Sequence, residues 1–399
     1  MALLHPSASA PPTLKVLHLV GARSDQGGIL SVLRALQSAG ATAAAAPASP
    51  RIQPSVWVHD SFVERRPPPL DLRRNPAAMD EATSHLQLLM AAWRSWPGLR
   101  RLLAAETFDV VHGHSRGAFP LTVWLARRRR AGGAGPAAVF TNHTYARRTG
   151  MYRTAVRRLH LPMVLLTPNM VRHYDLAGAA EVDIISACAG DRFFTAPLTP
   201  GPGAVTGRIR FVGVGNLVRW KNWHRLLEAW GQLPTDLRAR GCLDLWGPTL
   251  EDDEGRRYAA ELHALRERLE LADSVEFRGP TNAIVETVTG ADWFVLPSTN
   301  EPCSVALMEA LALGRPALVS ASGGNVDIVR PGVNGRHFVP DDVADLTRQL
   351  TAILRGEGGT ATPAEIRASV LHRAAGPVAA QYANLYLRLT GRDRPTAFS

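Results

Sequence analysis

Short apolar runs alternate with helical patterns along the first half of the chain. Residues 14–20, 108–114, 137–143, 163–168 and 182–187 have the length and composition of buried strands, and a helical pattern fills residues 29–39. Parallel strands need crossover connections, which are usually helices. The alternation therefore predicts an α/β fold with a parallel sheet.

The alternation of apolar runs and helical patterns stops near residue 195 and starts again after residue 207. Residues 195–207, TAPLTPGPGAVTG, are rich in proline and glycine and have no period, which is typical of a linker. Two successive α/β units predict two Rossmann-like domains that face each other across a cleft. We expect an N-terminal domain over residues 1–197, a linker over 198–205, a C-terminal domain over 206–374, and a final helix in 375–399 that returns to the first domain. The later strands are predicted at 209–215, 242–247, 274–279, 292–298 and 315–322.

Three segments look irregular. Residues 44–78 contain many prolines and charges and are expected to form a strand and a loop, while ARRRRAGGAG at 126–135 is expected to be a flexible basic loop. The acidic run EDDE at 251–254 is expected to lie in a solvated surface loop. No Asp-x-Asp pair lies at a predicted strand end, so we expect no catalytic metal.

The segment EPCSVALMEALALGRP, residues 301–316, predicts a buried helix with one unexpected residue. Apolar side chains surround the helix on all sides, yet Glu309 lies among them. Pro302 disfavours helical geometry at Glu301, Ser304 is a good N-cap, and Gly314 is placed to end the helix. Because an unpaired buried carboxylate is costly, Glu309 needs a partner.

Three roles are open for the two glutamates. The amides of residues 304–307, including Ser304 and Val305, suit a diphosphate at the helix start, and Glu309 would then bind the attached ribose. A hydrolase would use both carboxylates, but eight helical residues separate them by about 12 Å, which exceeds the usual 5–9.5 Å. The third role is a simple core ion pair between Glu309 and an arginine such as Arg315.

Charge is distributed unevenly along the 399 residues. Residues 1–200 contain 23 basic and 12 acidic residues, whereas residues 201–399 contain 22 and 23, and the whole chain carries +10. The excess in the first half predicts an anionic partner or reflects a preference for arginine codons. Only Lys15 and Lys221 are lysines, which makes each a candidate for a specific role.

Composition excludes several classes of protein. Hydrophobic residues make up 46% and charged residues 20%, as in globular proteins. No apolar run approaches the ~18 residues of a membrane span, and MALLHPSASAPP has no basic n-region or apolar core of a signal peptide. Three widely spaced cysteines suggest neither a disulfide framework nor a metal cluster, so a reducing cytoplasm is expected.

Four motifs in order make residues 210–350 resemble the donor domain of the retaining GT-B glycosyltransferases, family four. They are GNLVRWKN (215–222), ADWFVLPS (291–298), the Glu-x7-Glu pair Glu301 and Glu309, and GGNVDIVRPGVNGRHFVPDD (323–342). The first half resembles the family more loosely, through Gly27-Gly28, VHGHS (111–115) and FTNHTY (140–145).

The resemblance implies roles for individual residues. Glu301 would face the transferred sugar, Glu309 would bind the nucleotide ribose, and Lys221 with an arginine would neutralise the diphosphate leaving group. The family's arginine position reads Asn216 here, and Arg219, three residues later, is expected to substitute for it.

The first domain would contribute fewer residues. Gly28 begins the helix after the first strand, where backbone can approach a phosphate or sugar. His114 ends the strand 108–114 and, by the resemblance, would contact the donor sugar. His112 points to the same side of that strand. His143, which ends the next strand, is a weaker candidate on the acceptor side.

The resemblance therefore implies a retaining glycosyltransferase that moves a sugar from a UDP- or GDP-linked donor to a glycan or lipid-linked acceptor, without metal or cofactor. Two alternatives remain: an epimerase or hydrolase of nucleotide-sugars with the same fold, and a scaffold subunit weakened at Asn216. We expect a cytoplasmic protein in peripheral contact with an anionic membrane, acting in cell-surface polysaccharide synthesis. Nucleic acid is not expected, since basic and aromatic residues are not interleaved.

Overall fold

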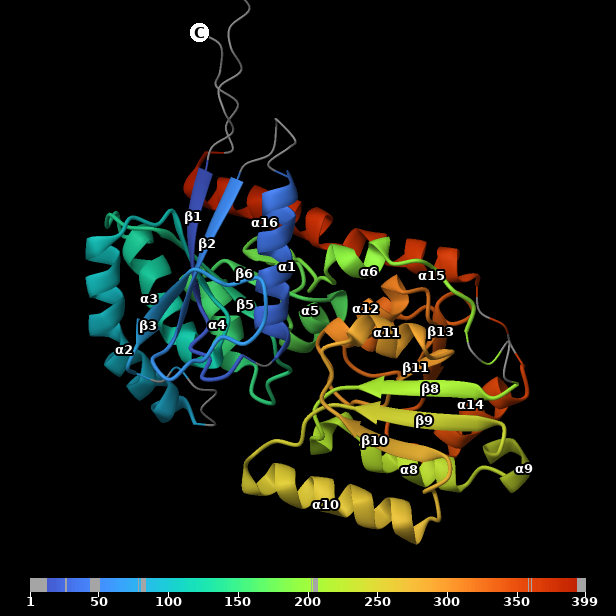
Figure 1. The fold of residues 1–399 in the computed structure, drawn as a ribbon. Helices are drawn as coiled ribbons and strands as arrows, with labels where there is room; N and C mark the ends of the chain where they lie inside the picture. The colour runs from blue at the N-terminus through green and yellow to red at the C-terminus, as the bar shows by residue number, and fades with distance from the viewer. Residues whose placement is uncertain are drawn as a thin grey trace, which may run out of the picture.

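The protein is described here by a computed structural model that covers residues 13–25, 27–43, 51–77, 79, 84–201, 203, 207–357, 359 and 361–392. It contains two parallel sheets, each covered by helices on both faces (Figure 1). This is the predicted GT-B architecture of two Rossmann-like units. None of the described helices is both long enough and apolar enough to cross a bilayer.

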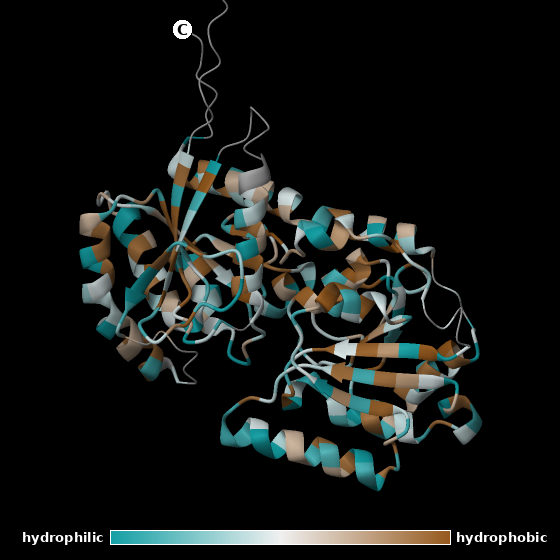
Figure 2. Cartoon of the chain, viewed as in Figure 1, coloured by the Kyte–Doolittle hydropathy of each residue, from teal (hydrophilic) through white to brown (hydrophobic). Residues whose placement is uncertain are grey.

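The first sheet has seven parallel strands in the order β3-β2-β1-β4-β5-β6-β7. The apolar runs of the first half form most of its strands, and Figure 2 shows brown residues in the middle of this sheet. Strands β4 and β5 are buried throughout, whereas β3 and β7 at the two edges are only partly buried. The strands are β1 (Thr13–Leu19), β2 (Arg51–His59), β3 (Leu72–Asn75), β4 (Val110–Gly113), β5 (Ala137–Asn142), β6 (Met163–Leu165) and β7 (Val182–Ile184). The helices are α1 (Gly28–Ala43), α2 (His85–Ala105), η1 (Arg116–Ala118), α3 (Phe119–Arg130), α4 (Gly150–Leu159), α5 (Pro168–Tyr174) and α6 (Asp191–Thr195).

The second sheet has six parallel strands in the order β10-β9-β8-β11-β12-β13. All five strands expected in this half are present, and the short β13 was not expected because Arg336 and His337 interrupt its apolar pattern. The strands are β8 (Ile209–Val214), β9 (Gly241–Trp246), β10 (Val275–Gly279), β11 (Trp293–Leu296), β12 (Ala317–Ser320) and β13 (Gly335–Phe338). The helices are η2 (Arg219–Lys221), α8 (Trp223–Gly231), α9 (Thr235–Arg238), α10 (Asp253–Arg268), α11 (Ile284–Thr289), α12 (Val305–Ala312), α13 (Asn325–Ile328), α14 (Val343–Leu354), α15 (Pro363–Ser369), η3 (Leu371–Arg373) and α16 (Ala375–Thr390).

Two segments predicted as loops are partly helical. The arginines of 126–135 form the last turn of α3, which ends at Arg130. Arginine is a good helix former, and cations at a helix C-terminus complement the helix dipole. The run 251–254 is split, because Asp252 caps α10 by accepting the amide of Gly255 at 2.7 Å, and the next two acidic residues form the first turn.

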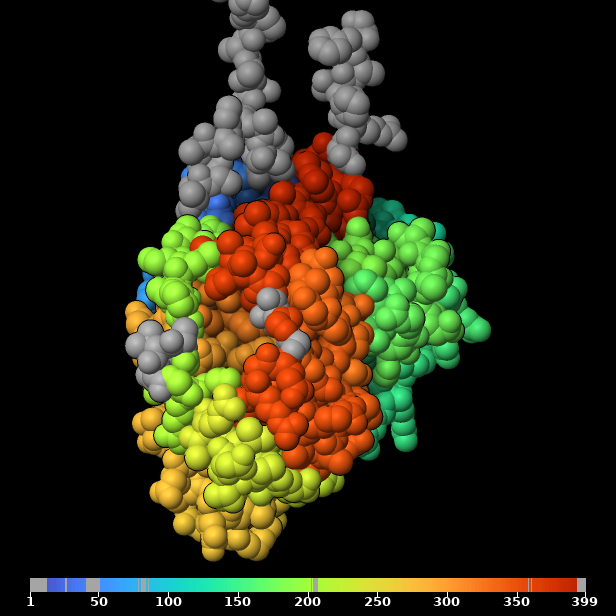
Figure 3. All heavy atoms as spheres, turned by 90° about the vertical axis from the view of Figure 1, so that its right-hand side faces the viewer, coloured from blue at the N-terminus to red at the C-terminus, as the bar shows by residue number. Residues whose placement is uncertain are grey.

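The last helix belongs spatially to the first sheet. After η3, α16 packs against α1, β4 and β5. Arg388 forms an ion pair with Asp183 of β7, and Arg392, just beyond the helix, forms one with Asp109 before β4. Figure 3 shows this red segment running from the orange surface of the second sheet's half to the upper end of the molecule.

One apolar core connects the two halves. It contains Phe140 and Met163 of the first sheet, Leu307 and Leu311 of α12, and Tyr382 of α16. A separate core lies under α8, α10 and α14 on the other face of the second sheet. The helix that contains Glu309 is therefore packed at the junction of the two halves.

Candidate active site

The order of the strands locates one crevice in each sheet. In both sheets the first strand in the chain (β1 or β8) has its second strand on one side and a later strand (β4 or β11) on the other. The strand order reverses at this point, and open α/β sheets bind ligands outside the carboxyl ends of strands there. The segments after β1, β4, β8 and β11 should therefore contain the site.

Lys221 and Glu301 meet at the crevice of the second sheet. Lys221 ends η2 after β8, and Glu301 follows β11, the neighbouring strand. The Nζ atom of Lys221 lies 2.5 Å from Oε2 of Glu301, and both side chains are buried. The ammonium also lies 4.4 Å from the centre of the Trp220 ring, within cation–π range. A buried charge pair thus stands where the resemblance places the sugar and the diphosphate.

Two glycines hold the backbone of Glu301 in place. The amide of Gly324 donates to the carbonyl of Glu301 at 2.7 Å. Gly323 has a φ of +58°, and a Cβ there would lie 2.9 Å from the amide nitrogen of Glu301. A Cβ on Gly324 would lie 2.0 Å from the carbonyl oxygen of Pro302. Only glycines allow this loop to pass so close to Glu301, which explains the GG of the 323–342 motif.

Helix α12 begins directly after this pair, as predicted. Ser304 caps it by accepting the amide of Leu307 at 3.3 Å, and Gly314, with a φ of +74°, lies just past its end. The other amides of the first turn have no partner within the helix. Across the junction lies Gly28, the first residue of α1, where an added Cβ would be 3.4 Å from Cγ2 of Val305. The two helix starts therefore face each other.

Glu309 lies half-buried on α12 without a partner. Among the described residues none forms a hydrogen bond or ion pair with its carboxylate. Burial raises the pKa of Glu309 to about 7, against the weaker opposing effects of Arg192 and Arg66. Arg315 donates instead to Thr199 and to the carbonyl of Thr289, both at 2.8 Å, so a core ion pair between Arg315 and Glu309 does not form.

Arg219 has partners on α10. Its guanidinium forms an ion pair with Glu261, with Nη2 2.5 Å from Oε2, and lies 4.9 Å from the centre of the Tyr258 ring. Asn216 lies after β8, and its main-chain carbonyl accepts the indole N–H of Trp223 at 3.1 Å. The role expected of Arg219 beside the leaving group stays a prediction, and it would require Arg219 to leave Glu261.

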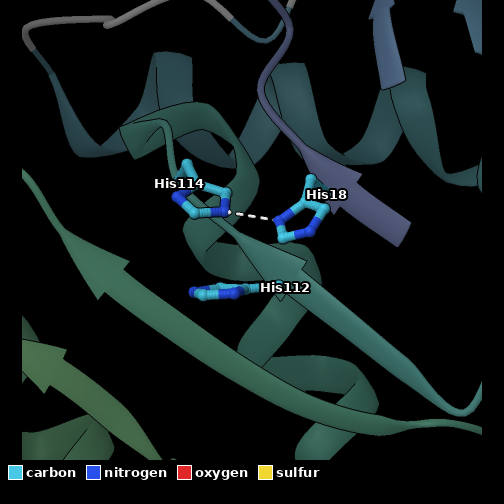
Figure 4. Close-up of side chains that lie close together, drawn as sticks. All are labelled: His18, His112 and His114. Carbon is cyan, nitrogen blue, oxygen red and sulfur yellow. Dashed lines mark hydrogen bonds between the residues drawn. The ribbon is translucent and has the colours of Figure 1, made fainter. Parts of the chain in front are cut away.

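His114 belongs to a buried histidine cluster rather than to an open surface. Its Nε2 lies 2.9 Å from Nδ1 of His18 on β1 (Figure 4). Its Nδ1 lies 3.0 Å from Nε2 of His143. Both ring nitrogens of His114 are therefore occupied. Burial lowers the pKa of His18 to about 3 and that of His143 to about 4, and the pKa of His114 also lies well below 6.5. The cluster is neutral at pH 7.

His112 stacks on His114, with ring centres 4.1 Å apart, as expected for two residues on one side of β4. Its nitrogens contact Tyr386 Oη at 2.7 Å and Thr141 Oγ1 at 2.6 Å. Of the described residues, only His18, His112 and His114 have ligand atoms close enough to hold a metal ion, within 4.8 Å of one another. An ion there would have to displace these hydrogen bonds, and no carboxylate lies in the cluster to balance its charge.

A pocket of about 320 Å³ opens at the crevice of the first sheet. It is bounded by the turn between β1 and α1 and by Ser115 after β4, and it is large enough for a small polar molecule. The lining residues include Gly21, Arg23, Gly27, Gly28, Met79 and Ser115.

Comparison with known proteins agrees with this geometry. Residues 200–369, which contain Lys221, Glu301 and Glu309, match the family model described as glycosyl transferases group 1. The second half of the chain therefore contains a group 1 glycosyltransferase domain.

Curated relatives match this chain only in part. The phosphatidyl-myo-inositol mannosyltransferase of Mycobacterium leprae is 26% identical over 265 residues, which is 65% of this chain and 67% of that protein. The D-inositol 3-phosphate glycosyltransferase of Geodermatophilus obscurus is 28% identical over 197 residues, 47% of this chain and 43% of that one. The chain spans between 9% and 53% of the length of the first three relatives.

Solved structures share the whole fold at low sequence identity. Sucrose-phosphate synthase from Thermosynechococcus elongatus superposes with a TM-score of 0.71 and 18% identity, covering 95% of this chain and all of that one. Anabaena HepE in complex with UDP and glucose gives a TM-score of 0.66 and 18% identity over 93% of this chain and 99% of that one. These likenesses establish the two-domain GT-B fold.

The structure thus brings together only some of the residues expected in the site. Lys221, Glu301, Ser304 and Val305 form one group, with Gly28 opposite. Glu309 lies on the same helix, Asn216 lies after the same strand as Lys221, and His114 and Arg219 are engaged elsewhere. Sequence reasoning missed His18, although its place in LKVLHLV, an isolated histidine within a buried strand, was a visible signal.

Proposed function

We propose that this protein is a retaining glycosyltransferase that uses a UDP- or GDP-linked sugar and passes the sugar to a glycan or lipid-linked acceptor. The observation that carries the proposal is the buried pair of Lys221 and Glu301 at the start of α12, 2.5 Å apart. The pair lies at the edge of the sheet where ligands bind, so a ligand can reach both side chains. We therefore interpret it as a pair whose members change partners when the donor binds.

The diphosphate of the donor is a suitable new partner for Lys221. The first-turn amides of α12 and the ammonium would together stabilise the negative charge that develops on the leaving group. Glu301, released from Lys221, would then accept hydrogen bonds from hydroxyl groups of the transferred sugar. Lys221 is neutralised by Glu301 before binding and by phosphate afterwards, while the sugar hydroxyl groups replace the ammonium as donors to Glu301.

Glu309 would bind the ribose of the same donor. An ionised carboxylate is a strong acceptor for two neighbouring hydroxyl groups. Burial raises its pKa to about 7, and none of the described residues donates a hydrogen bond to it. Ribose hydroxyl groups would supply them.

In the proposed reaction the bond between the anomeric carbon and the phosphate oxygen breaks, and the acceptor oxygen bonds to the same face of the carbon. The leaving phosphate takes the acceptor's proton while Lys221 holds it. No covalent sugar–enzyme intermediate is part of the proposal. The leaving-group charge is assigned to Lys221 and α12 rather than to a metal, so activity should persist in EDTA.

A thermal-shift panel tests donor binding. UDP, GDP, ADP, TDP and CMP, with their common sugars, are added to wild type, Glu309→Ala and the control Glu254→Ala, which removes an exposed carboxylate of α10. A ligand at 100 times its dissociation constant adds about 2.7 kcal/mol of stability. One diphosphate should stabilise wild type and the control but not Glu309→Ala. If no nucleotide stabilises wild type, the proposed function is wrong.

One observation favours a second candidate, a scaffold subunit without activity. Asn216 stands in the family's arginine position, and Arg219 is paired with Glu261. Nucleotide binding with no transfer to any of a set of acceptors would support the scaffold. Release of free sugar, or conversion to an epimeric donor, would instead support the hydrolase or epimerase alternative.

The free cysteines Cys188, Cys242 and Cys303 fit a cytoplasmic protein, since two are buried as thiols and none of the described residues forms a disulfide. A role in cell-surface polysaccharide synthesis is part of the same proposal. It is supported by the name of one relative, the lipopolysaccharide core biosynthesis glycosyltransferase LpsE of Rhizobium meliloti, 29% identical over 198 residues.

A further inference from the structure

Helix α2 presents an apolar stripe to solvent. Leu86, Leu89, Met90 and Trp93 follow the i, i+3, i+4, i+7 spacing of one helix face. Their exposed fractions are 68%, 59%, 43% and 77%. Single exposed apolar residues are common in soluble proteins, but a continuous stripe that includes a tryptophan marks an interaction surface.

Helix α3 extends this surface. The rings of Trp96 on α2 and Trp124 on α3 meet edge to face with centres 3.8 Å apart, and Trp124 remains 41% exposed. The guanidinium of Arg128 lies 5.7 Å from the centre of the Trp124 ring. Both helices lie on the outer side of the first sheet, away from the second (Figure 1). We call this surface the α2–α3 face, defined by Leu86, Leu89, Met90, Trp93 and Trp124.

The two helices that form the α2–α3 face carry charge of one sign. Neither α2 nor α3 contains an acidic residue. Exposed arginines continue the stripe along α2 and form the last turn of α3, and none of them makes an ion pair with another described residue. These arginines are Arg94, Arg100, Arg101, Arg127, Arg128, Arg129 and Arg130.

We propose that the α2–α3 face docks on an anionic lipid bilayer. An amphipathic helix with tryptophan and leucine on one side and arginines beside them lies in the plane of a membrane surface, with its apolar side chains among the acyl chains and its cations near the headgroups. Both components are present here on adjacent helices. A protein partner with an apolar patch would not require an unbroken set of unpaired cations around it.

The position of the α2–α3 face also indicates what docking would achieve. This step rests on the proposed function. Helix α2 packs against η1, and Ser115, immediately before η1, lines the 320 Å³ pocket together with Arg23. Docking through α2 would bring this pocket near the headgroup layer. The face would therefore hold the protein where a lipid-linked acceptor is exposed.

Vesicle flotation tests the docking directly. The full chain is mixed with vesicles of phosphatidylcholine alone, or of phosphatidylcholine with phosphatidylglycerol. We expect binding to the anionic vesicles only, and weaker binding as salt is raised. The double variant Leu89→Gln with Trp93→Gln should bind the anionic vesicles about tenfold more weakly, because two apolar side chains no longer enter the bilayer.

Matched controls separate surface effects from folding. Leu371→Gln removes a leucine that is 55% exposed on η3, far from α2 in the chain, and should leave binding unchanged. Arg127→Ala with Arg130→Ala should weaken binding by roughly fivefold for each arginine. Arg256→Ala with Arg257→Ala on α10 should have no comparable effect.

Several outcomes would overturn the proposal. These are equal binding to neutral and anionic vesicles, no binding to either, or equal loss in Leu371→Gln and in the α2 variant. Concentration-dependent dimerisation abolished by Leu89→Gln with Trp93→Gln would assign the face to a second copy of the chain. Nucleotide thermal shifts in the same variants keep the two proposals apart, because donor binding does not involve α2.

Discussion

Lys221 and Glu301 are 80 positions apart in the chain, yet they form a buried ion pair of 2.5 Å between the loops after β8 and β11. The topology of the second sheet causes this meeting, because β11 hydrogen-bonds directly to β8. A buried pair has a measurable consequence for stability. Removal of one member leaves the other charge buried without a partner.

Lys221→Met should lower the free energy of unfolding by about 3–5 kcal/mol, since the carboxylate of Glu301 then has no counter-charge. The double variant Lys221→Met with Glu301→Gln should recover most of that loss. Chemical denaturation of the three proteins measures both values. A double variant no more stable than Lys221→Met would show that the pair is not the source of the penalty.

Glu301→Gln separates donor binding from turnover. The change releases Lys221 for the diphosphate, so affinity for the nucleoside diphosphate should be kept or should rise. Sugar transfer should fall by on the order of a hundredfold or more, because the sugar loses a charged acceptor. Calorimetric titration with the nucleotide and a radiolabelled transfer assay measure the two quantities. Loss of affinity in Glu301→Gln would contradict the proposed exchange of partners.

Glu309 predicts a pH dependence of stability. Its pKa is about 7 in the folded protein and about 4.5 when unfolded. The folded state therefore binds the proton more tightly, and stability falls as pH rises from about 4.5 to about 7. Glu309→Gln should remove this slope. At pH 8 it should exceed wild type by up to about 3 kcal/mol, with no difference at pH 4.

The same group predicts the pH dependence of donor binding. If the ribose binds the ionised carboxylate, nucleotide affinity should decrease as pH falls below about 7 in wild type, and Glu309→Gln should bind weakly at every pH. Titrations at about pH 6 and pH 8 make the comparison. A wild-type affinity that is equal at both would exclude the ribose role of Glu309.

The histidine cluster predicts acid sensitivity. The pKa of His18 is about 3 in the folded protein and 6.5 when unfolded, because burial disfavours the cation. Its contribution to stability is complete above about pH 6.5 and is lost as pH falls. At pH 5 the loss is about 2 kcal/mol for this residue alone.

His18→Asn keeps a hydrogen-bonding atom near the position of Nδ1 but cannot titrate. It should lose less stability than wild type between pH 7.5 and pH 5, measured by denaturation at each pH. His263→Asn on the exposed side of α10 is the control for removal of a surface histidine. An unchanged pH slope in His18→Asn would mean that the cluster takes up protons without cost.

The positions of most strands along the chain and the two ends of α12 were predictable because they depend on local patterns: apolar runs, Ser304 as a cap, and Gly314 as a stop. Partners far apart in the sequence were not predictable. The resemblance suggested Arg219 as the substitute for the arginine missing at Asn216, but it could not reveal that Glu261 and Tyr258 on α10 are its partners in this structure. The roles proposed for Glu301 and Glu309 remain predictions.

In the first domain, prediction from the sequence was limited in a different way. His114 was correctly placed at the carboxyl end of a buried strand, but its contact with His18 depends on β1 lying beside β4. The arginines of residues 126–135 look like a loop until the helix before them is recognised. The apolar stripe of α2 was present in the sequence as Leu86, Leu89, Met90 and Trp93, but only their exposure distinguishes a surface from a core.

The return of the chain through α16 has a mechanical consequence. The polypeptide passes between the two sheets twice, after β7 on the way out and before α16 on the way back. A domain joined to its neighbour by one chain segment can rotate in any direction. A domain joined by two segments can rotate only about the line that joins the two connections. The two domains should therefore open and close around the nucleotide by rotation about a single axis. Cleavage of the chain before Ala375 should allow rotations about other axes.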